Sequence, residues 1–202
     1  MARTASKNIF CLEGDWWGNL KKPSSVRPIF DLVAQMKPHP RYIHRGIGTR
    51  EEFDHYLKVW AQKKFASHPI LYLAFHGNPR ALCVGDQRRR DGEVGLDQVA
   101  EKLGGRCKGR FVHFGACSTL KCDVRHLKRF LTKTGALAVS GYTKDVGWMQ
   151  SAAFEVFLLS TMQDNGRTRA GAKAIRDRID VAAKKQAKEL GFRMVVASNG
   201  RA

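Results

Sequence analysis

The sequence has no apolar run of 18 or more residues, so it predicts no membrane-spanning helix. Its first seven residues are too short and too polar a stretch for a secretory signal, and we therefore expect a cytoplasmic protein. Cysteine is scarce and odd in number, with five residues scattered over the chain. This distribution argues against a disulfide framework and fits reduced thiols. Internal repeats, linkers and low-complexity segments are also missing.

Acidic residues are only half as numerous as basic ones. The 18 Asp and Glu residues stand against 36 Lys and Arg residues, which gives a net charge of +18. Such an excess makes nucleic acid a partner to consider. The positive charges are spread along the chain, however, and do not form the single dense block of a nucleic-acid-binding arm. Contact with nucleic acid is therefore permitted by the composition but not required by it.

The length and the apolar content predict one folded domain over residues 1–202. A chain of 202 residues with 43% hydrophobic residues can build a single core. Continuous apolar runs indicate buried strands, and a period of 3.6 residues indicates helices. The expected strands cover 8–12, 42–44, 70–75, 111–114, 136–139 and a closing strand over 192–196. The expected helices cover 26–33, 49–61, 96–103, 123–131, 148–162 and 168–190, the last being long and basic.

This alternation of strands and helices predicts an α/β fold, in which a mostly parallel sheet is covered by helices on both faces. Local signals mark several helix ends. Ser24 or Ser25 is expected to cap the first helix and Asp123 the fourth. A capping box begins the second helix at Thr49, and Gly104 ends the third.

Two of the expected central strands end in residues that carry chemistry. One strand runs directly into His76 and Gly77, and the next strand leads to Cys117. The carboxyl ends of parallel strands meet at one rim of a sheet, where neighbouring strands lie roughly 5 Å apart. His76 and Cys117 would there form a base and a nucleophile. The N–H groups of Gly77 and Cys117 would form an oxyanion hole, because a residue without a side chain allows a substrate to approach closely.

Other interpretations of these residues are less specific. A cysteine or a histidine at the end of a strand is often a packing residue or a satisfied polar group. A structural zinc site usually has paired C-x₂-C motifs. These motifs are missing around Cys117, Cys122 and His126, with His113 nearby. A G-x-S-x-G elbow is missing around Ser140, so a serine hydrolase is not expected. We expect neither a metal nor a cofactor.

Taken together, the two motifs resemble the caspase-like clan of cysteine peptidases, which includes caspases, metacaspases, separases and the bacterial CHAT-type proteases. The resemblance rests on a hydrophobic strand followed by His-Gly and a hydrophobic strand followed by Ala-Cys, here residues 71–77 and 111–117. The segment with Ser140 and Trp148 resembles the clan's substrate-pocket strand, in its CHAT and metacaspase versions. Over residues 8–162, the resemblance implies a caspase-like, flavodoxin-like three-layer fold, cysteine endopeptidase activity, and a role in bacterial defence or stress response.

The resemblance also implies how a substrate is chosen. Caspases use an arginine-lined pocket and cut after Asp, whereas metacaspases, separases and several CHAT proteases use acidic pockets and cut after Arg or Lys. The Trp-Arg arrangement of caspases is absent, because Met149 follows Trp148. Asp145 and Asp15 are the candidate pocket carboxylates, although Asp145 could instead cap a helix and Asp15 could be solvated. We expect a protein or peptide substrate that is cut after Arg or Lys.

Two further hypotheses stay open. The positive charge suits a non-catalytic basic α/β module that binds nucleic acid or a protein partner, and the basic helix over 168–190 could also hold a peptidase near a regulatory partner. The polar loop over 86–94 contains three arginines, which an acidic pocket could accept during autoprocessing. The alternative for this loop is a solvated surface segment, with short hairpin strands beside it.

Overall fold

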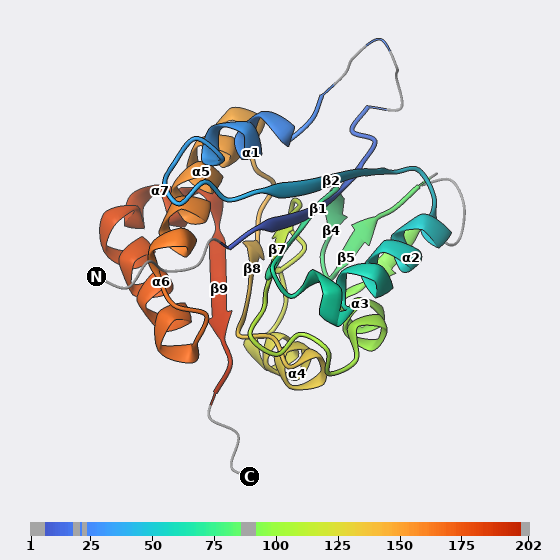
Figure 1. The fold of residues 1–202 in the computed structure, drawn as a ribbon. Coiled ribbons are helices and arrows are strands. Elements are labelled where there is room, and N and C mark those ends of the chain that lie inside the picture. The colour runs from blue at the N-terminus through green and yellow to red at the C-terminus, as the bar shows by residue number, and fades with distance from the viewer. Residues whose placement is uncertain (1–6, 18–20, 22–23, 86–91, 199–202) are drawn as a thin grey trace.

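A six-stranded sheet forms the centre of the molecule (Figure 1). The computed structural model describes residues 7–17, 21, 24–85 and 92–198. The strands follow the order β2-β1-β3-β7-β8-β9, and every neighbouring pair is parallel except β8 with β9. Their bounds are β1 Ile9–Gly14, β2 Tyr42–Ile47, β3 Ile70–Ala74, β7 Phe111–Gly115, β8 Ala138–Tyr142 and β9 Phe192–Val196. The expected α/β fold with a mostly parallel sheet is confirmed.

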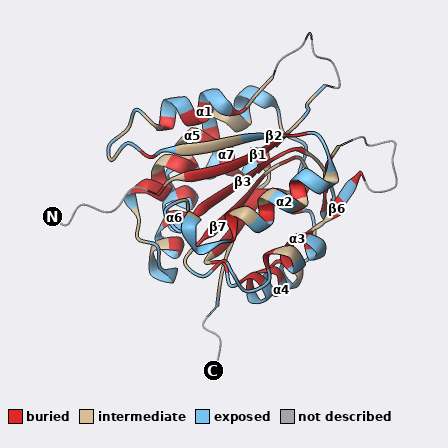
Figure 2. Ribbon diagram, turned by 45° about the vertical axis from the view of Figure 1, so that its right-hand side comes forward, coloured by how far each residue is buried: buried red, intermediate tan, exposed pale blue. Residues whose placement is uncertain are grey.

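Helices cover both faces of this sheet and complete three layers. One face carries α1 Arg27–Val33, α5 Trp148–Asp164, α6 Arg169–Ala182 and α7 Lys184–Leu190. The other face carries α2 Arg50–Trp60, α3 Leu96–Leu103 and α4 Val124–Thr134, and a short 3-10 turn, Lys63–Phe65, follows α2. Figure 2 shows β1, β3 and β7 buried, the edge strand β2 less so, and helices that are exposed on their outer sides. In the part of the chain that the structure describes, none of the helices has the length and apolarity needed to cross a membrane.

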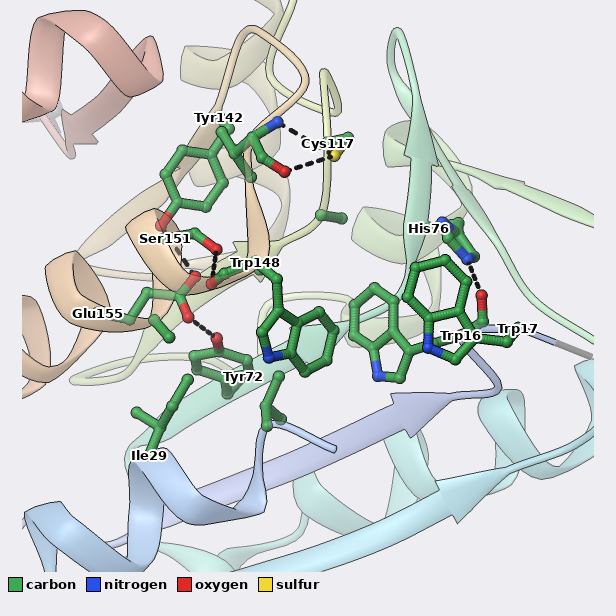
Figure 3. Close-up of a pocket in the computed structure, with 15 residues that line it drawn as sticks. Trp16, Trp17, Ile29, Tyr72, His76, Cys117, Tyr142, Trp148, Ser151 and Glu155 are labelled. Carbon is green, nitrogen blue, oxygen red and sulfur yellow. Dashed lines mark hydrogen bonds between the residues drawn. The ribbon is translucent and has the colours of Figure 1, made fainter. Parts of the chain in front are cut away.

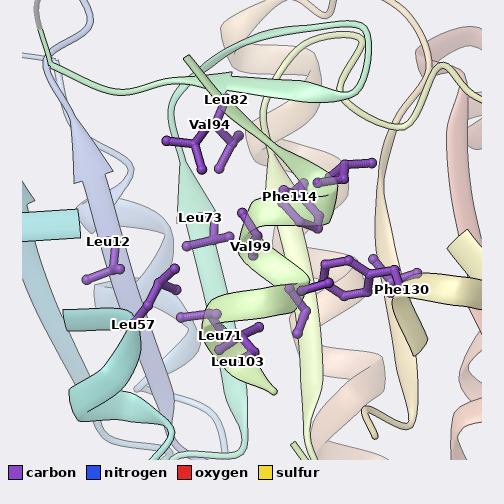
Figure 4. Close-up of a cluster of buried hydrophobic side chains, with 14 of the residues drawn as sticks. Leu12, Leu57, Leu71, Leu73, Leu82, Val94, Val99, Leu103, Phe114 and Phe130 are labelled. Carbon is purple, nitrogen blue, oxygen red and sulfur yellow. The ribbon is translucent and has the colours of Figure 1, made fainter. Parts of the chain in front are cut away.

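β3 is apolar throughout because both of its faces are buried. Leu71 and Leu73 of β3 point to one side, where they pack with Leu57 of α2 and Val99 of α3 (Figure 4). Tyr72 between them points to the opposite side and joins the second core cluster. Removing a buried leucine side chain costs about 2–5 kcal/mol in such a core. The sheet is therefore a firm support for the groups at the ends of its strands.

The order of the strands places a crevice at one rim of the sheet. β2 lies on one side of β1, whereas β3, β7, β8 and β9 all lie on the other side. In open α/β sheets, ligands bind at the carboxyl ends of the strands, beside such a reversal of direction. The segments that follow β1, β3 and β7 carry Trp16, His76 and Cys117, so these three residues belong to the same rim.

A small antiparallel sheet begins at His76, directly after β3. It consists of β4 His76–Asn78, β5 Ala81–Cys83 and β6 Glu93–Gly95. The short hairpin strands expected beside the polar loop are therefore present. Residues 86–91 of that loop, including the three arginines of the hypothetical autoprocessing site, lie outside the described residues. The main sheet and the small sheet together determine where His76 lies.

Local signals fix most, but not all, of the helix ends. The capping box at Thr49 is present, Asp123 caps α4 through the N–H group of Arg125, and Gly104 ends α3 in the left-handed region. The cap expected at Ser24 or Ser25 is wrong, because the N-cap of α1 lies one residue later and has no side-chain hydrogen bond. The Ser25 hydroxyl instead donates to a buried carboxylate of β1.

The basic helix expected over 168–190 is two helices. α6 ends at Ala182 and α7 begins at Lys184, with non-helical dihedral angles of φ −129° and ψ 23° at Ala183. The break lets α7 turn Ala187 and Leu190 into the core beside β9. A single straight helix would satisfy the sequence period but not this packing.

Candidate active site

The structure brings His76 and Cys117 together. β3 and β7 are paired strands in which Ala74 lies opposite Gly115, and each of the two candidate residues follows two positions later. Both residues line one cavity of about 150 Å³ at the carboxyl rim of the sheet (Figure 3). Sequence reasoning predicted this neighbourhood from the parallel order of the strands.

Cys117 lies in a turn that is hydrogen-bonded to the segment after β8. The N–H group of Ser118 donates to the Lys144 carbonyl at 2.9 Å, and the Ser118 hydroxyl donates to Asp145 at 2.8 Å. Ser118 has a φ of 54°, a conformation that costs a residue with a side chain about 1–3 kcal/mol. The N–H group of Val146 lies 3.4 Å from the Cys117 sulfur and orients it. Such strain persists only where surrounding contacts offset it, and it is common at active sites.

The other four cysteines sit in surroundings that keep their thiols protonated. Burial raises the pKa of the Cys107 thiol to about 12, although Arg110 and Arg106 act in the opposite direction. Burial also raises the pKa of Cys11 well above its usual value, with Glu13 and Glu155 adding to the effect. The same cause raises the pKa values of two half-buried thiols, Cys83 and Cys122.

The His76 ring is oriented by a backbone carbonyl. Its Nε2 atom lies 2.5 Å from the carbonyl oxygen of Trp16. Because a carbonyl oxygen can only accept, Nε2 carries the proton, and Nδ1 of the neutral ring is left with the lone pair. The indole ring of Trp16 also packs edge-on against the imidazole at 5.3 Å. His76 is thus held in the tautomer that can take a proton at Nδ1.

A buried carboxylate, Glu155 of α5, lines the floor of the cavity. Its side chain is only 3% exposed and accepts hydrogen bonds from the Tyr72 hydroxyl, from the Tyr142 hydroxyl at 2.9 Å and from His113 Nε2 at 3.3 Å. Burial raises the pKa values of both tyrosines far above their usual value, and the Glu155 charge adds to this. The two hydroxyls therefore remain protonated donors.

The walls of the cavity are aromatic and apolar. Trp16 and Trp148 meet edge-to-face with ring centroids 4.9 Å apart, and Val26 and Ile29 of the α1 region line the wall beside them. Figure 3 shows Trp148 and Trp16 between the two candidate catalytic side chains and Ile29. A narrow apolar wall above an acidic floor fits a long side chain with a cationic end.

The predicted substrate-binding residues are only partly found at the cavity. Trp148 lines it, whereas Ser140, Asp145 and Asp15 do not. Ser140 is buried on β8, where its hydroxyl bonds His113 Nδ1 at 3.0 Å. Asp145 is exposed and accepts from Ser118, and Asp15 is exposed and accepts from the N–H group of Trp17. Both aspartates follow a strand, but turns direct their carboxylates away from the cavity.

Sequence reasoning missed Glu155 and, in the aromatic wall, Trp16. One signal was available, because Glu155 is the single charged residue between Trp148 and Met162 in a helix that is otherwise largely apolar. A lone carboxylate in such a helix is expected to be buried with partners or to serve a site. The partners themselves come from three different strands, so their convergence is visible only in the fold.

A second cavity, of about 360 Å³, lies at the opposite rim of the sheet. Three cationic residues line it, Lys108, Lys128 and Arg169, and no carboxylate is among its lining residues within the described chain. Its other walls come from α4, from the segments before β7 and β8 and from the two residues that follow β9. This groove is therefore separated from the first cavity by the length of the strands.

Among the described residues, no group of three or more His, Cys, Asp or Glu side chains is arranged to hold a metal ion. A metal site is therefore not formed by the four residues that lie close together in the sequence, Cys117, Cys122, His126 and His113. His113 is buried against Glu155, and His126 lies on α4 near Arg129.

Comparisons with known proteins add a family and a fold. A family model described as "Family of unknown function (DUF6642)" matches residues 6–195. No curated protein matches the sequence. Among solved structures, caspase-1 from Spodoptera frugiperda is similar, with a TM-score of 0.55 and 9% sequence identity over 96% of this chain and 87% of the caspase chain. At this identity, the likeness shows a caspase-like fold.

Proposed function

The chain belongs to the DUF6642 family, whose function is unknown, and we propose that it is a cysteine endopeptidase of the caspase-like clan. Cys117 is the nucleophile and His76 is the proton carrier. The observation that carries the proposal is that both side chains line one cavity at the ends of two paired central strands. The caspase-like fold supports the same class of activity.

The proposed reaction begins with a proton transfer from the Cys117 thiol to Nδ1 of His76. The sulfur attacks the peptide carbonyl carbon, a C–S bond forms, and the carbonyl oxygen becomes an oxyanion. The N–H groups of Gly77 and Cys117 stabilise that oxyanion. His76 then gives its proton to the leaving amine as the C–N bond breaks, and water hydrolyses the thioester. A close approach of the two backbones supports this hole, because a Cβ on Gly77 would collide with the Cys117 carbonyl oxygen.

We further propose that the enzyme cuts after Arg or Lys, with Glu155 as the selecting carboxylate. Glu155 accepts three hydrogen bonds, and a carboxylate can accept about four, so one position remains for a substrate cation. A charge-assisted hydrogen bond to a guanidinium or ammonium group contributes about 1.5–3 kcal/mol. Glu155 thus takes the role that the sequence suggested for Asp145 or Asp15.

A basic preference would place the protein with the CHAT-type and metacaspase-like members of the clan that its sequence resembles. A role in bacterial defence or stress response is proposed on that resemblance alone.

Covalent labelling tests the proposed activity. A peptidyl acyloxymethyl ketone ending in Arg is expected to alkylate Cys117 once per chain, because the thiolate displaces its carboxylate leaving group. Cys117→Ala should abolish labelling, His76→Ala should slow it, and a matched probe ending in Asp should react poorly. Mass spectrometry locates the label. No reaction, or equal reaction at several cysteines, would contradict a peptidase site at Cys117.

A second candidate function is nucleic-acid binding by the groove at the opposite rim. The observation in its favour is the group of three cations, Lys108, Lys128 and Arg169, in a groove whose described lining has no carboxylate. Phosphate contacts make binding depend on salt. The slope of the logarithm of the binding constant against the logarithm of the salt concentration falls in magnitude by about one for each contact removed. The double variant K108A/K128A should therefore weaken oligonucleotide binding and flatten its salt dependence.

The matched control is K184A/K185A, which removes the same charge from exposed positions on α7. Fluorescence anisotropy with a labelled oligonucleotide measures both variants in the Cys117→Ala background. Equal losses in the two double variants would mean diffuse attraction by the net charge, and would remove the case for a groove.

A further inference from the structure

The carboxylate of Glu13, at the end of β1, collects four hydrogen bonds in a nearly closed site. Its side chain is 5% exposed. It accepts from the Val26 N–H group at 2.7 Å, the Ser25 hydroxyl at 2.6 Å, the Trp16 indole Nε1 at 2.6 Å and His44 Nε2 at 2.5 Å. These donors come from the loop after β1, from the start of α1 and from β2. One carboxylate therefore ties together three segments beside the candidate active site.

The charge of Glu13 is stabilised by these donors. Burial alone would raise the pKa of its carboxyl group, but the hydrogen bonds from His44, Ser25, Trp16 and Val26 together hold it below its usual value. The carboxylate is thus an acceptor for all four donors. It does not line the cavity, so substrate does not reach it.

Trp16 connects this carboxylate to His76. At one end, the indole Nε1 donates to Glu13. At the other end, the backbone carbonyl accepts from His76 Nε2, and the indole ring packs on the imidazole. The same ring lies edge-to-face with Trp148 across the cavity wall. Fixing the indole thus fixes both the carbonyl that selects the His76 tautomer and one wall of the pocket.

We propose that Glu13 is a positioning residue for His76 and acts through Trp16. Its carboxylate holds the indole, and the held Trp16 keeps its carbonyl on Nε2. His76 is thereby kept with a lone pair on Nδ1 that can take a proton. The proposal rests on the role of His76 in the proposed peptidase, but its primary readout is the tautomer of His76, which exists whether or not the protein cuts peptides.

Two variants break the connection at different points. Glu13→Gln keeps the shape of the side chain but replaces one of the two acceptor oxygens by an NH₂ group. Because an NH₂ group cannot accept, the donors on that side of the carboxylate lose their hydrogen bonds. Trp16→Phe removes the indole donor but keeps an aromatic ring and the backbone carbonyl. Glu52→Gln is the matched control, because Glu52 also accepts backbone N–H groups, at the capping box of α2, and does not line the cavity. The control should lower the melting temperature without changing His76.

The measurement is ¹⁵N NMR of the ring nitrogens in full-length protein labelled at its seven histidines, with His76→Gln used to assign the signal. Wild-type protein should show His76 as the Nε2–H tautomer, and both Glu13→Gln and Trp16→Phe should shift it toward a mixture. In the active enzyme, Glu13→Gln should lower kcat about 10- to 100-fold with little change in KM, because Glu13 does not line the cavity. Loss of an outer partner of a metal-binding histidine has an effect of this size. The double variant should lose little more than either single variant, because both act on one connection.

An unchanged His76 tautomer in folded Glu13→Gln and Trp16→Phe proteins would overturn the proposal and leave Glu13 a structural residue. If Glu13→Gln does not fold, Trp16→Phe alone decides. A protein that cuts no peptide but shows the tautomer shift would contradict the proposed function while sustaining the connection from Glu13 to His76.

Discussion

Cys117 differs from the other cysteines because its sulfur accepts the Val146 N–H group and it lines the cavity with His76, and this geometry predicts its reactivity. Because burial raises the pKa values of the other four thiols, their thiolate fractions at neutral pH are small, and Cys11 and Cys107 are also closed to reagents. We expect iodoacetamide at pH 7.5 to modify Cys117 first. Time-resolved peptide mapping measures the order of modification. Earlier modification of Cys83 or Cys122 in folded protein would contradict the environment assigned to Cys117.

Glu155 should carry the preference for a basic residue before the cut. Glu155→Gln keeps the size of the side chain and removes its charge, so kcat/KM for an Arg substrate should fall about 10- to 100-fold, which corresponds to the loss of about 1.5–3 kcal/mol. A matched substrate with a neutral residue should be affected less. Asp145→Asn is the control, because Asp145 is exposed outside the cavity. A loss of the basic preference in Asp145→Asn but not in Glu155→Gln would reverse the assignment.

At the scale of elements, the junction between β4 and the Cys117 turn is tight. A Cβ atom on Gly77 would collide with the carbonyl oxygen of Cys117 and with the Thr119 hydroxyl. We expect Gly77→Ala to push the two segments apart, lowering both the melting temperature and the labelling rate of Cys117. Gly46→Ala on the edge strand β2 is the control, because a Cβ there meets nothing within 4 Å. Equal behaviour of the two variants would show that the junction is not tight.

The sequence predicts the strands well because most residues of each central strand are apolar and buried, and the parallel order of the strands brings His76 beside Cys117. It predicts side-chain directions at the rim poorly. Asp145 and Asp15 follow strands as expected, yet neither reaches the cavity, since turn contacts with Ser118 and Trp17 direct their carboxylates elsewhere. Such contacts depend on the tertiary structure of the loops and not on strand periodicity.

Long-range partners explain the remaining differences. Ser25 looks like a helix cap in the sequence, but its hydroxyl donates to Glu13, which lies 12 residues earlier. Glu155 finds its three donors on β3, β7 and β8, so its role emerges only when the sheet and α5 are assembled. The helix break at Ala183 likewise follows from the packing of α7 and not from a local breaker residue.

At the scale of the whole molecule, Glu13 should contribute to the loss of stability in acid. A carboxyl group whose folded-state pKa lies below its unfolded-state value stabilises the fold above the unfolded value, and this contribution is lost as pH falls through the folded-state value. The pKa of Glu13 lies below its usual value of 4.5 in the folded protein. Glu13→Gln should therefore melt at a lower temperature than wild type at pH 7, and the difference should shrink below pH 4.5. Calorimetry over pH 3–7 measures this, and a constant difference would contradict it.

The most direct test of the central claim is cleavage of a peptide library that varies the residue before the cut. Wild-type protein is expected to cut after Arg and Lys, and Cys117→Ala, which removes only one sulfur atom at a rim, is expected to stay folded and lose activity by several orders of magnitude. Circular dichroism confirms the fold of the variant. Undiminished cleavage by Cys117→Ala would contradict the assignment of a cysteine peptidase. The same conclusion would follow if folded wild-type protein cut no member of the library and reacted with none of the electrophilic probes.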